Sequence, residues 1–582
     1  MDRPWRRTAL ALCIFTAAFI ALTVGSYTQK SATVDEPQHL TAGYTALRLH
    51  DYRLDPEHPP FLRLWAALPL LAMPDVRLDT NTVSWETGQS WDFSHHFLYE
   101  LNDADHLLYR ARFMIVILGI VLGVLIFSWA QELFGFWTAA AVLALYCLEP
   151  NILAHSSLVT TDLGVTCFIF GALYFLWRLT RMLTLGNAVG LTVFFALAQV
   201  SKFSGLVLGP IVVVLLLVRL VGGGAWPYQF RNRGELRSVR DKLLTMAAVI
   251  VVLAVTSYIA VWAVYGFRYG PTAPSTDLTL LRNNPQLLDR VHTTWVVGSW
   301  FDEHRLLPDT YTRSLILAQV KGQRRSAYLA GEFSRTGWWY YFPLAFIIKT
   351  PLAVLFLFTC GLVLSLKTRT RWKSEDAFII LPLLIYLGIA IMAHLNIGLR
   401  HLLPIYPLVL LVCGITLEEM RVRWRPVFLV VPIVVAAVEL ALVYPHCLAF
   451  FNQLIRGPGN GHLVLLDSNL DWGQDLKPLK RWMDANQVAQ INLDYFGTAD
   501  PAYYGIHATV LTGSPSSSTT QFTEPHLPGY VAVSVQNLHG VRGGESQREF
   551  YAPLLERDPT AIIGYSIHVY WVETNWWYNS QP

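Results

Sequence analysis

Acidic residues at the ends of long apolar segments are the first candidates for chemistry in this 582-residue chain. The adjacent carboxylates Asp35 and Glu36 follow the first apolar run, and Asp162 lies just before the fourth. Charged groups at membrane depth are costly and usually serve a function. A carboxylate that is partly removed from water can take a proton from a hydroxyl or an amine. We therefore predict that Asp35, Glu36 and Asp162 are catalytic.

Basic side chains occur at comparable borders in other segments. Lys202 lies in the short polar stretch "SKFSG" between two apolar runs, and Lys349 lies inside "YYFPLAFIIKTP". Arg400 and His401 stand at the start of another run. Cations beside a reacting group can stabilise a phosphate that leaves with negative charge. We expect a donor phosphate to be bound by Lys349, Arg400, His401, Lys202 and His58.

Each of these residues also has a structural interpretation. Asp35 and Asp162 could cap the helices that follow them, because a capping aspartate accepts backbone hydrogen bonds. Lys202 could extend along its aliphatic stem to the membrane surface, and Arg400 could anchor a helix end. We favour function over capping for the pair Asp35–Glu36, whereas both interpretations of Asp162 have equal weight.

The composition indicates that membrane helices position these residues. Hydrophobic residues make up 53% of the chain and charged residues only 15%, and the mean hydropathy is +0.37. Soluble domains usually carry about 25% charged residues. The small net charge of +3 gives no support to nucleic-acid binding. We expect an α-helical polytopic membrane protein that binds no nucleic acid.

Apolar runs of sufficient length predict about eleven transmembrane helices, since a helix needs roughly 20 residues to cross the hydrocarbon core. The first run follows a basic start and is interpreted as a retained anchor helix. The run 187–221 is too long for one span, so we predict a hairpin with Lys202 and Gly205 at its tip. The predicted spans are 8–27, 112–130, 137–154, 163–180, 187–201, 204–221, 244–265, 342–365, 377–394, 402–420 and 427–444.

The basic residues predict the orientation in the cytoplasmic (inner) membrane. With the hairpin, all basic clusters fall on one side, which the positive-inside rule assigns to the cytoplasm together with the N-terminus. We therefore predict a transmembrane domain, 1–445, with outer loops 28–110 and 266–341, and an extracytoplasmic domain, 446–582. The clusters are Arg3, Arg6 and Arg7; Arg178 and Arg181; "RNRGELRSVRDK"; "KTRTRWK"; and "RVRWR".

The C-terminal segment has the pattern of an α/β domain. Strand-like runs such as "GYVAVSVQ" and "AIIGYSIHVYWV" alternate with the helix-like "DLKPLKRWMDAN". The stretch "DSNLDWGQD" precedes this pattern. We interpret it as a hinge into the domain and not as part of the site.

An ordered set of motifs resembles the membrane-embedded C-type glycosyltransferases that use a polyprenyl-phosphate sugar, in particular the bacterial protein-O-mannosyltransferase and aminoarabinose-transferase group. The motifs are "DEPQH", "PEHPPFLRLW", "HSSLVTTD", "LPDTY", "GWWYYFPLAFIIKTPLA" and "NIGLRHLLPIYP". The resemblance continues to about Trp482 and is weak beyond it. It implies a C-type glycosyltransferase fold of about eleven transmembrane helices, followed by the C-terminal α/β extracytoplasmic domain.

The resemblance implies that a hexose or pentose is transferred with inversion from a polyprenyl-phosphate donor. Asp35 matches the expected general base, and Glu36 would orient the acceptor or hold the base. Asp162 matches an acidic residue that helps to shape the active centre. Glu57 and His58 occupy the place of the "EKPP" motif of the aminoarabinose transferases. The glutamate of that motif can bind a metal, and this chain has histidine where the motif has lysine. The mannosyltransferases require no metal, so a divalent metal at Glu57 stays open.

Two other classes of protein also stay open. A transporter or flippase of lipid-linked sugars would combine many helices with few charges, but it predicts repeated halves and charges near the bilayer midplane. A non-catalytic polysaccharide-assembly subunit would bind through its outer domain, and its charged residues would be scattered. Within the enzyme class, the sequence specifies neither the sugar nor the acceptor, which could be a protein, a lipid or a glycan.

Overall fold

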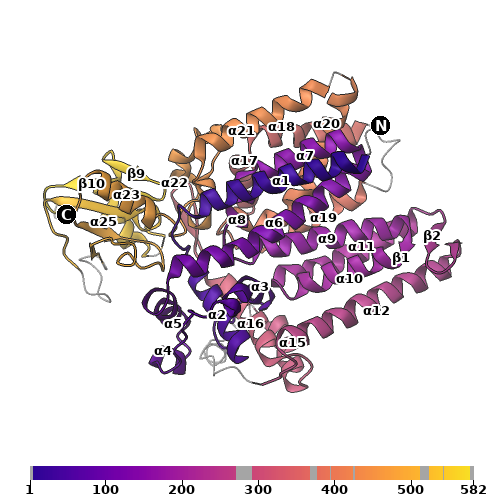
Figure 1. The fold of residues 1–582 in the computed structure, drawn as a ribbon, viewed down its shortest axis with the longest axis horizontal. Helices are drawn as coiled ribbons and strands as arrows, with labels where there is room; N and C mark the ends of the chain where they lie inside the picture. Colours follow the sequence, from indigo (N-terminus) through magenta and orange to yellow (C-terminus); the bar gives the residue numbers. More distant parts are fainter. Residues whose placement is uncertain are drawn as a thin grey trace.

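The structure is a computed structural model that describes residues 4–270, 291–367, 376–393, 395–423, 426–511, 523–541 and 543–576. It shows a long bundle of helices with a mixed α/β domain at one end (Figure 1). The N-terminus lies at the opposite end of the bundle from this domain. The prediction of a mostly helical polytopic membrane protein with a C-terminal α/β region is confirmed.

Among the described residues, six helices are long and apolar enough to cross a membrane. The number rises to eight if each of two bent helix pairs is one span. The six are α1 (Pro4–Tyr27), α6 (Ala104–Phe134), α9 (Asp162–Arg181), α11 (Leu208–Val221) with the short helix η3 (Phe203–Val207), α12 (Val239–Val264), and α20 (Tyr406–Arg423) with η4 (Leu399–Ile405). The pairs are α7 (Phe136–Cys147) with α8 (Pro150–Ser156), bent by 64°, and α17 (Tyr341–Lys349) with α18 (Leu352–Lys367), bent by 119°.

The predicted number of about eleven spans is therefore reached only if shorter helices are counted. Three of the predicted segments form apolar helices of 10–17 residues, which are α10 (Leu185–Gln199), α19 (Ala377–Met392) and Val427–Val443, the last containing α21 (Val430–Val443). The predicted hairpin is present, because α10 ends at Gln199 and its side-chain Nε2 donates to the carbonyl of Gly205, 3.1 Å away. Both α10 and α11 contact α9 and α12.

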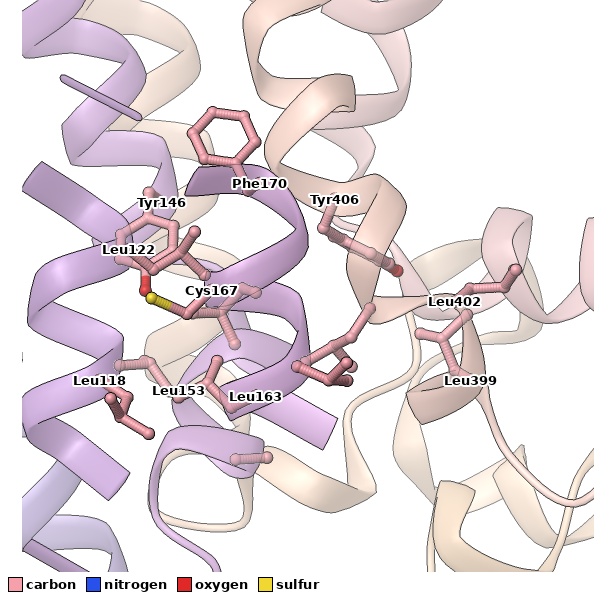
Figure 2. Packing of buried hydrophobic residues seen from close by; sticks show 14 of the residues in the cluster. Leu118, Leu122, Tyr146, Leu153, Leu163, Cys167, Phe170, Leu399, Leu402 and Tyr406 are labelled. Atoms are coloured by element: carbon pink, nitrogen blue, oxygen red, sulfur yellow. The ribbon is translucent and has the colours of Figure 1, made fainter. Parts of the chain in front are cut away.

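Large apolar side chains fill the centre of the bundle. Figure 2 shows Leu118 and Leu122 of α6, Tyr146 of α7, and Cys167 and Phe170 of α9 packed against one another. The Tyr146 hydroxyl donates to the carbonyl of Gly119 at 2.6 Å, so its buried polar tip is satisfied. By contrast, α12 exposes Val251, Val255 and Ile259. A continuous apolar helix face of this kind is suited to contact with lipid.

The segment 28–110, which was predicted as the first outer loop and keeps that name below, folds into short helices that pack beside the bundle. A buried network joins two of them, because the Asp55 carboxylate lies 2.8 Å from Arg63 Nη1 and 2.6 Å from His39 Nδ1. Burial would raise the pKa of Asp55, but Arg63 and His39 hold it far below its usual range. The helices of this loop are α2 (Glu36–Leu49), α3 (Phe61–Ala67), α4 (Val83–Glu86) and α5 (Ser90–His95).

Of the segment 266–341, which was predicted as the second outer loop, residues 271–290 lie outside the described residues. It contains α15 (His292–Glu303), α16 (Asp309–Arg324) and the antiparallel hairpin of β4 (Ala327–Leu329) and β5 (Glu332–Ser334). A small sheet of β1 (Leu183–Thr184), β2 (Trp226–Gln229) and β3 (Arg233–Leu236) lies at the far end of the bundle (Figure 1).

The C-terminal domain, which we call the outer domain after its predicted location, is built on a five-stranded sheet with the order β7-β6-β8-β10-β9. Strand β6 (Ile491–Asp494) runs parallel to β7 (Ala508–Val510) and β8 (Gly529–Ser534). Strand β10 (Ile567–Val572) is antiparallel to β8 and to β9 (Ala561–Ile563). The helices of the domain are α22 (Gly461–Val464), α23 (Leu476–Ala485), α24 (Val535–Leu538) and α25 (Glu545–Leu555).

Candidate functional site

Four charged residues from distant parts of the sequence converge at one point, and we call them the charged centre. Arg400 Nη1 lies 3.5 Å from Asp162 Oδ2 and 3.6 Å from Asp35 Oδ2. Lys202 Nζ donates to Asp162 Oδ1 at 2.5 Å. The side chain of Asp35 is 25% exposed, whereas that of Asp162 is only 2% exposed. Asp35 is thus the acid of the centre that another molecule can reach.

Each member of the charged centre stands at the end of a helix. Asp162 begins α9, and Arg400 lies in η4, just before α20. Lys202 occupies the tip of the hairpin between α10 and η3. Asp35 precedes α2, but its side chain makes no capping hydrogen bond. Its capping interpretation is therefore wrong, and its carboxylate is directed to Arg400 instead.

Glu36 lies next to Asp35 in sequence but has a different environment. Its side chain is fully buried and forms a double contact with Arg112, at 2.8 Å through Nε and 2.6 Å through Nη2. The backbone amides of Thr33 and Val159 also donate to it, at 2.8 Å and 2.9 Å. Burial would raise the pKa of Glu36, but Arg112 lowers it below its usual range. This arrangement favours the role of holding the base over that of orienting an acceptor.

A tryptophan from the outer part of the chain forms one wall of the charged centre. The Arg400 guanidinium carbon lies 4.2 Å from the centre of the Trp472 ring, which is buried. A guanidinium stacked on an aromatic face is held by the ring quadrupole. His155 of α8 contacts the same indole edge-on, with ring centres 6.4 Å apart. Trp472 therefore contacts both Arg400 and His155.

Several ring and guanidinium nitrogens near the charged centre have no hydrogen-bond partner among the described residues. They are Arg400 Nε, His58 Nδ1, His155 Nδ1 and His401 Nε2. Burial and the charge of Lys202 lower the pKa of His58 well below its usual range, so its ring is neutral and can donate one hydrogen bond. The turn that carries His58 is held at the hairpin tip, because Phe61 N donates to Val200 O at 3.2 Å. These nitrogens are suited to an anion.

Lys349 is not a member of the charged centre, although we predicted that it binds phosphate. Its Nζ donates to the carbonyls of Leu448, at 3.0 Å, and Asn469, and it lies 4.4 Å from the centre of the Phe451 ring. These contacts tie α17 to the start of the outer domain. Its predicted role in binding the donor phosphate therefore has no support from its neighbours.

The donor set for a metal is incomplete in the described part of the chain. No three His, Cys, Asp or Glu side chains there have the geometry of a metal site. The predicted ligand Glu57 is partly buried in the first outer loop. The described residues thus offer no set of three ligands for a metal at Glu57.

Three residues of this region were not identified from the sequence, and each had only a weak signal. Arg112 stands at the start of a predicted span, where a basic residue is ordinary. Trp472 and His155 lie inside quoted motifs, but nothing in their spacing indicates that they meet. Arg400 and Asp162 are 238 positions apart, so sequence periodicity gives no information on such contacts.

Residues 104–228 match the family model of dolichyl-phosphate-mannose-protein mannosyltransferase. No curated protein matches the chain. Two solved structures similar to it are ArnT from Cupriavidus metallidurans bound to undecaprenyl phosphate (13% identity, TM-score 0.44, 96% of this chain and 97% of that chain) and the Archaeoglobus fulgidus oligosaccharyltransferase complex with Zn and sulfate (14% identity, TM-score 0.41, 89% of this chain). The chain spans 59% of the length of the archaeal protein.

The matched segment runs from the start of α6 into β2 and includes Asp162 and Lys202 of the charged centre. It contains "HSSLVTTD", one of the motifs that carry the resemblance, and the hairpin tip that was predicted from the topology. Residues 104–228 are therefore similar to a family of membrane glycosyltransferases, in agreement with the resemblance that the motifs predicted.

Proposed function

We propose that the protein is an inverting glycosyltransferase, which moves a sugar from a polyprenyl-phosphate donor to an acceptor on the outer face of the cytoplasmic membrane. The observation that carries this proposal is the position of Arg400, within 3.6 Å of both Asp35 and Asp162. An accessible carboxylate and a buried cation at one point are the groups that such a transfer requires. The family match over residues 104–228 supports the same chemistry.

The donor phosphate binds at the cationic side of the charged centre. Arg400 and Lys202 supply positive charge, which stabilises a phosphate as it leaves with increasing negative charge. The unpartnered Nε of Arg400 supplies a hydrogen-bond donor, and the unpartnered ring nitrogens of His58, His155 and His401 can each donate in the tautomer that protonates them. A buried donor without a partner costs about 1–3 kcal/mol. A bound phosphate would therefore satisfy groups that the protein alone leaves unsatisfied.

Asp35 acts as the general base. It takes the proton of the acceptor hydroxyl or amine, whose lone pair attacks the anomeric carbon of the sugar. The bond between that carbon and the phosphate oxygen breaks, and the polyprenyl phosphate leaves with the electron pair. Because this is a single displacement, the configuration at the anomeric carbon is inverted. The partial exposure of Asp35 leaves it accessible to an acceptor from outside.

The distribution of charge supports the proposed orientation. The sheet β1–β3 lies at the end of the bundle away from the outer domain (Figure 1). Arg233 in β3, and Arg231 and Arg237 on either side of that strand, are exposed. Basic residues of this kind favour the cytoplasmic side. Most of the predicted basic cluster 367–373 lies outside the described residues. The outer domain and the loops 28–110 and 266–341 would then face away from the cytoplasm.

The test is a transfer assay with purified protein and a panel of polyprenyl-phosphate sugars, with protein, lipid and glycan acceptors analysed by mass spectrometry. At least one donor should be consumed, and its sugar should appear on the acceptor with inverted configuration. Asp35→Asn should lower the rate by roughly 100- to 10,000-fold, the range expected for loss of a general base. Asp75→Asn, in an exposed part of the same loop, is the matched control. Undiminished transfer by Asp35→Asn would contradict the proposed role.

A further inference from the structure

The segment Asp467–Asp475, which we call the clamp loop, is bonded to the polypeptide beside Asp35. Val34 N donates to the Trp472 carbonyl at 2.9 Å. Ser31 N donates to the carbonyl of Gln474 at 3.0 Å. These bonds run between neighbouring backbones, so a shift of the clamp loop must also move the residue next to Asp35.

The clamp loop is equally bonded to the polypeptide beside Arg400. Ser468 Oγ donates to the carbonyl of Ile397 at 2.9 Å, and Leu399 N donates to Asn469 Oδ1 at 2.9 Å. The approach is close, because a Cβ atom added to Gly398 would lie 2.2 Å from Ser468 Oγ. Only glycine fits here without a shift. The clamp loop therefore holds Ile397 and Leu399, which precede Arg400 in the chain.

Trp472 belongs to the same loop that is bonded to the residues beside Asp35 and to the residues before Arg400. Its indole is buried against Leu158 and Phe496, and its face carries the Arg400 guanidinium. The ring therefore limits the directions in which the guanidinium can turn. In the observed position, the Nη1 atom lies within 3.6 Å of both Asp35 and Asp162.

The outer domain holds the clamp loop in place. At its end, Asp475 accepts from Ser566 Oγ at 2.7 Å and from Lys30 Nζ at 2.5 Å. Ser566 precedes β10 of the outer sheet, whereas Lys30 follows α1 of the bundle. The domain also binds the residue before Asp35, because Thr498 Oγ1 donates to the carbonyl of Val34 at 2.7 Å. The outer domain thus supports the clamp loop, whose Trp472 contacts Arg400, and also binds the residue before Asp35.

We propose that Trp472 is a positioning residue, and that through the clamp loop the outer domain is a structural part of the catalytic centre. It fixes the direction of the Arg400 guanidinium and its distance from Asp35. This inference rests on the proposed transfer reaction, because its readout is the rate of that reaction. The interpretation of "DSNLDWGQD" as a simple hinge is replaced, since this stretch packs against the charged centre.

The test compares Trp472→Leu, Trp472→Phe and Arg400→Ala with the double variant Trp472→Leu/Arg400→Ala. Trp472→Leu should lower kcat/KM by roughly 10- to 100-fold, because a small misplacement of a catalytic group is that costly. Trp472→Phe keeps an aromatic face for the Arg400 guanidinium, so it should retain most of the wild-type kcat/KM. If Trp472 acts through Arg400, the double variant should be no slower than Arg400→Ala alone, since the two losses are then not additive.

Trp571→Leu is the matched control, because Trp571 lies on β10 with 48% of its surface exposed. Additive losses in the double variant, or normal transfer by Trp472→Leu, would overturn the inference while the proposed function stands. Failure of the wild type with every donor would overturn the proposed function itself. If Trp472→Leu does not fold, the inference is tested with Thr498→Val and Trp472→Phe instead. Thr498→Val should then lower kcat without lowering the unfolding temperature, and unchanged kcat would overturn the proposal.

Discussion

Asp35 and Glu36 are adjacent in sequence, yet they lie in two regions with opposite character. Glu36 is fully buried, and Arg112 and two backbone amides occupy its oxygens. Asp35 is partly exposed, faces Arg400 at 3.6 Å and makes no capping hydrogen bond. A carboxylate whose partners are all within the protein is part of the scaffold. A carboxylate that remains accessible, beside donors without partners, is suited to a ligand.

The largest effect is expected on the scaffold side of this comparison. Glu36→Gln removes the charge that compensates buried Arg112, and breaking such a pair costs roughly 3–5 kcal/mol of the free energy of unfolding. Chemical unfolding of the purified protein in detergent measures this loss. Glu100→Gln is the control, because the Glu100 side chain is 56% exposed and pairs only with surface histidines. A Glu36→Gln variant as stable as the wild type would remove the distinction between the two regions.

The next effect concerns the ligand side. Arg400→Ala should weaken the binding of undecaprenyl phosphate by roughly 10- to 100-fold, the value of one or more hydrogen bonds to a charged group. Its stability should change little, because Asp162 keeps its contact with Lys202. Calorimetric titration gives the affinity, and Arg557→Ala on the exposed surface of the outer domain serves as the control. Equal affinity in wild type and Arg400→Ala would place the phosphate elsewhere.

Acid should affect the outer domain through a cluster of three histidines. His462 Nδ1 and His539 Nε2 are 2.8 Å apart, and the His568 ring is centred 5.0 Å from that of His462. Burial lowers the pKa of His462 to about 4 and, with repulsion inside the cluster, lowers those of His539 and His568 to about 3. Since the unfolded chain binds more protons below pH 6.5, stability should fall as the pH drops from about 6.5 towards 4.

The expected loss is on the order of 1–2 kcal/mol for each buried histidine between pH 7 and 5. Thermal unfolding at the two pH values measures it. His539→Asn should reduce the pH dependence, whereas His507→Asn, at an exposed position of the same domain, should not. The prediction is refuted if the wild type is as stable at pH 5 as at pH 7.

The smallest effect on the reaction is expected for Lys349. Lys349→Met removes a cation that contacts two backbone carbonyls and the Phe451 ring, so it should act on packing between α17 and the outer domain. The donor KM should stay within about threefold of the wild type, because a group that touches no ligand does not change its binding directly. A KM increase as large as that of Arg400→Ala would instead support the role predicted from the sequence.

The sequence predicted the helical segments and the hairpin at Lys202 because these features depend on local composition. It also identified all four members of the charged centre, since each is a charged residue at the border of an apolar run. Which neighbours surround them could not be predicted in the same way. The pairing of Glu36 with Arg112 and the stacking of Arg400 on Trp472 are long-range contacts with no periodic signal.

Local patterns also failed where the chain bends. The run 342–365 was predicted as one span, but α17 and α18 meet at an angle of 119° next to Lys349. Pro351, which lies between the two helices, cannot donate a backbone hydrogen bond and disfavours a helical conformation at the residue before it. The bend places Lys349 beside the carbonyls of the outer domain, which explains why its charge alone led to a different assignment.

The most direct test of the central claim is an experimental structure of the wild-type protein with undecaprenyl phosphate bound. The phosphate should lie within hydrogen-bonding distance of Arg400 and Lys202, with Asp35 accessible to an acceptor beside it. A phosphate bound at Lys349, or at any place where Arg400 and Lys202 cannot reach it, would contradict the account.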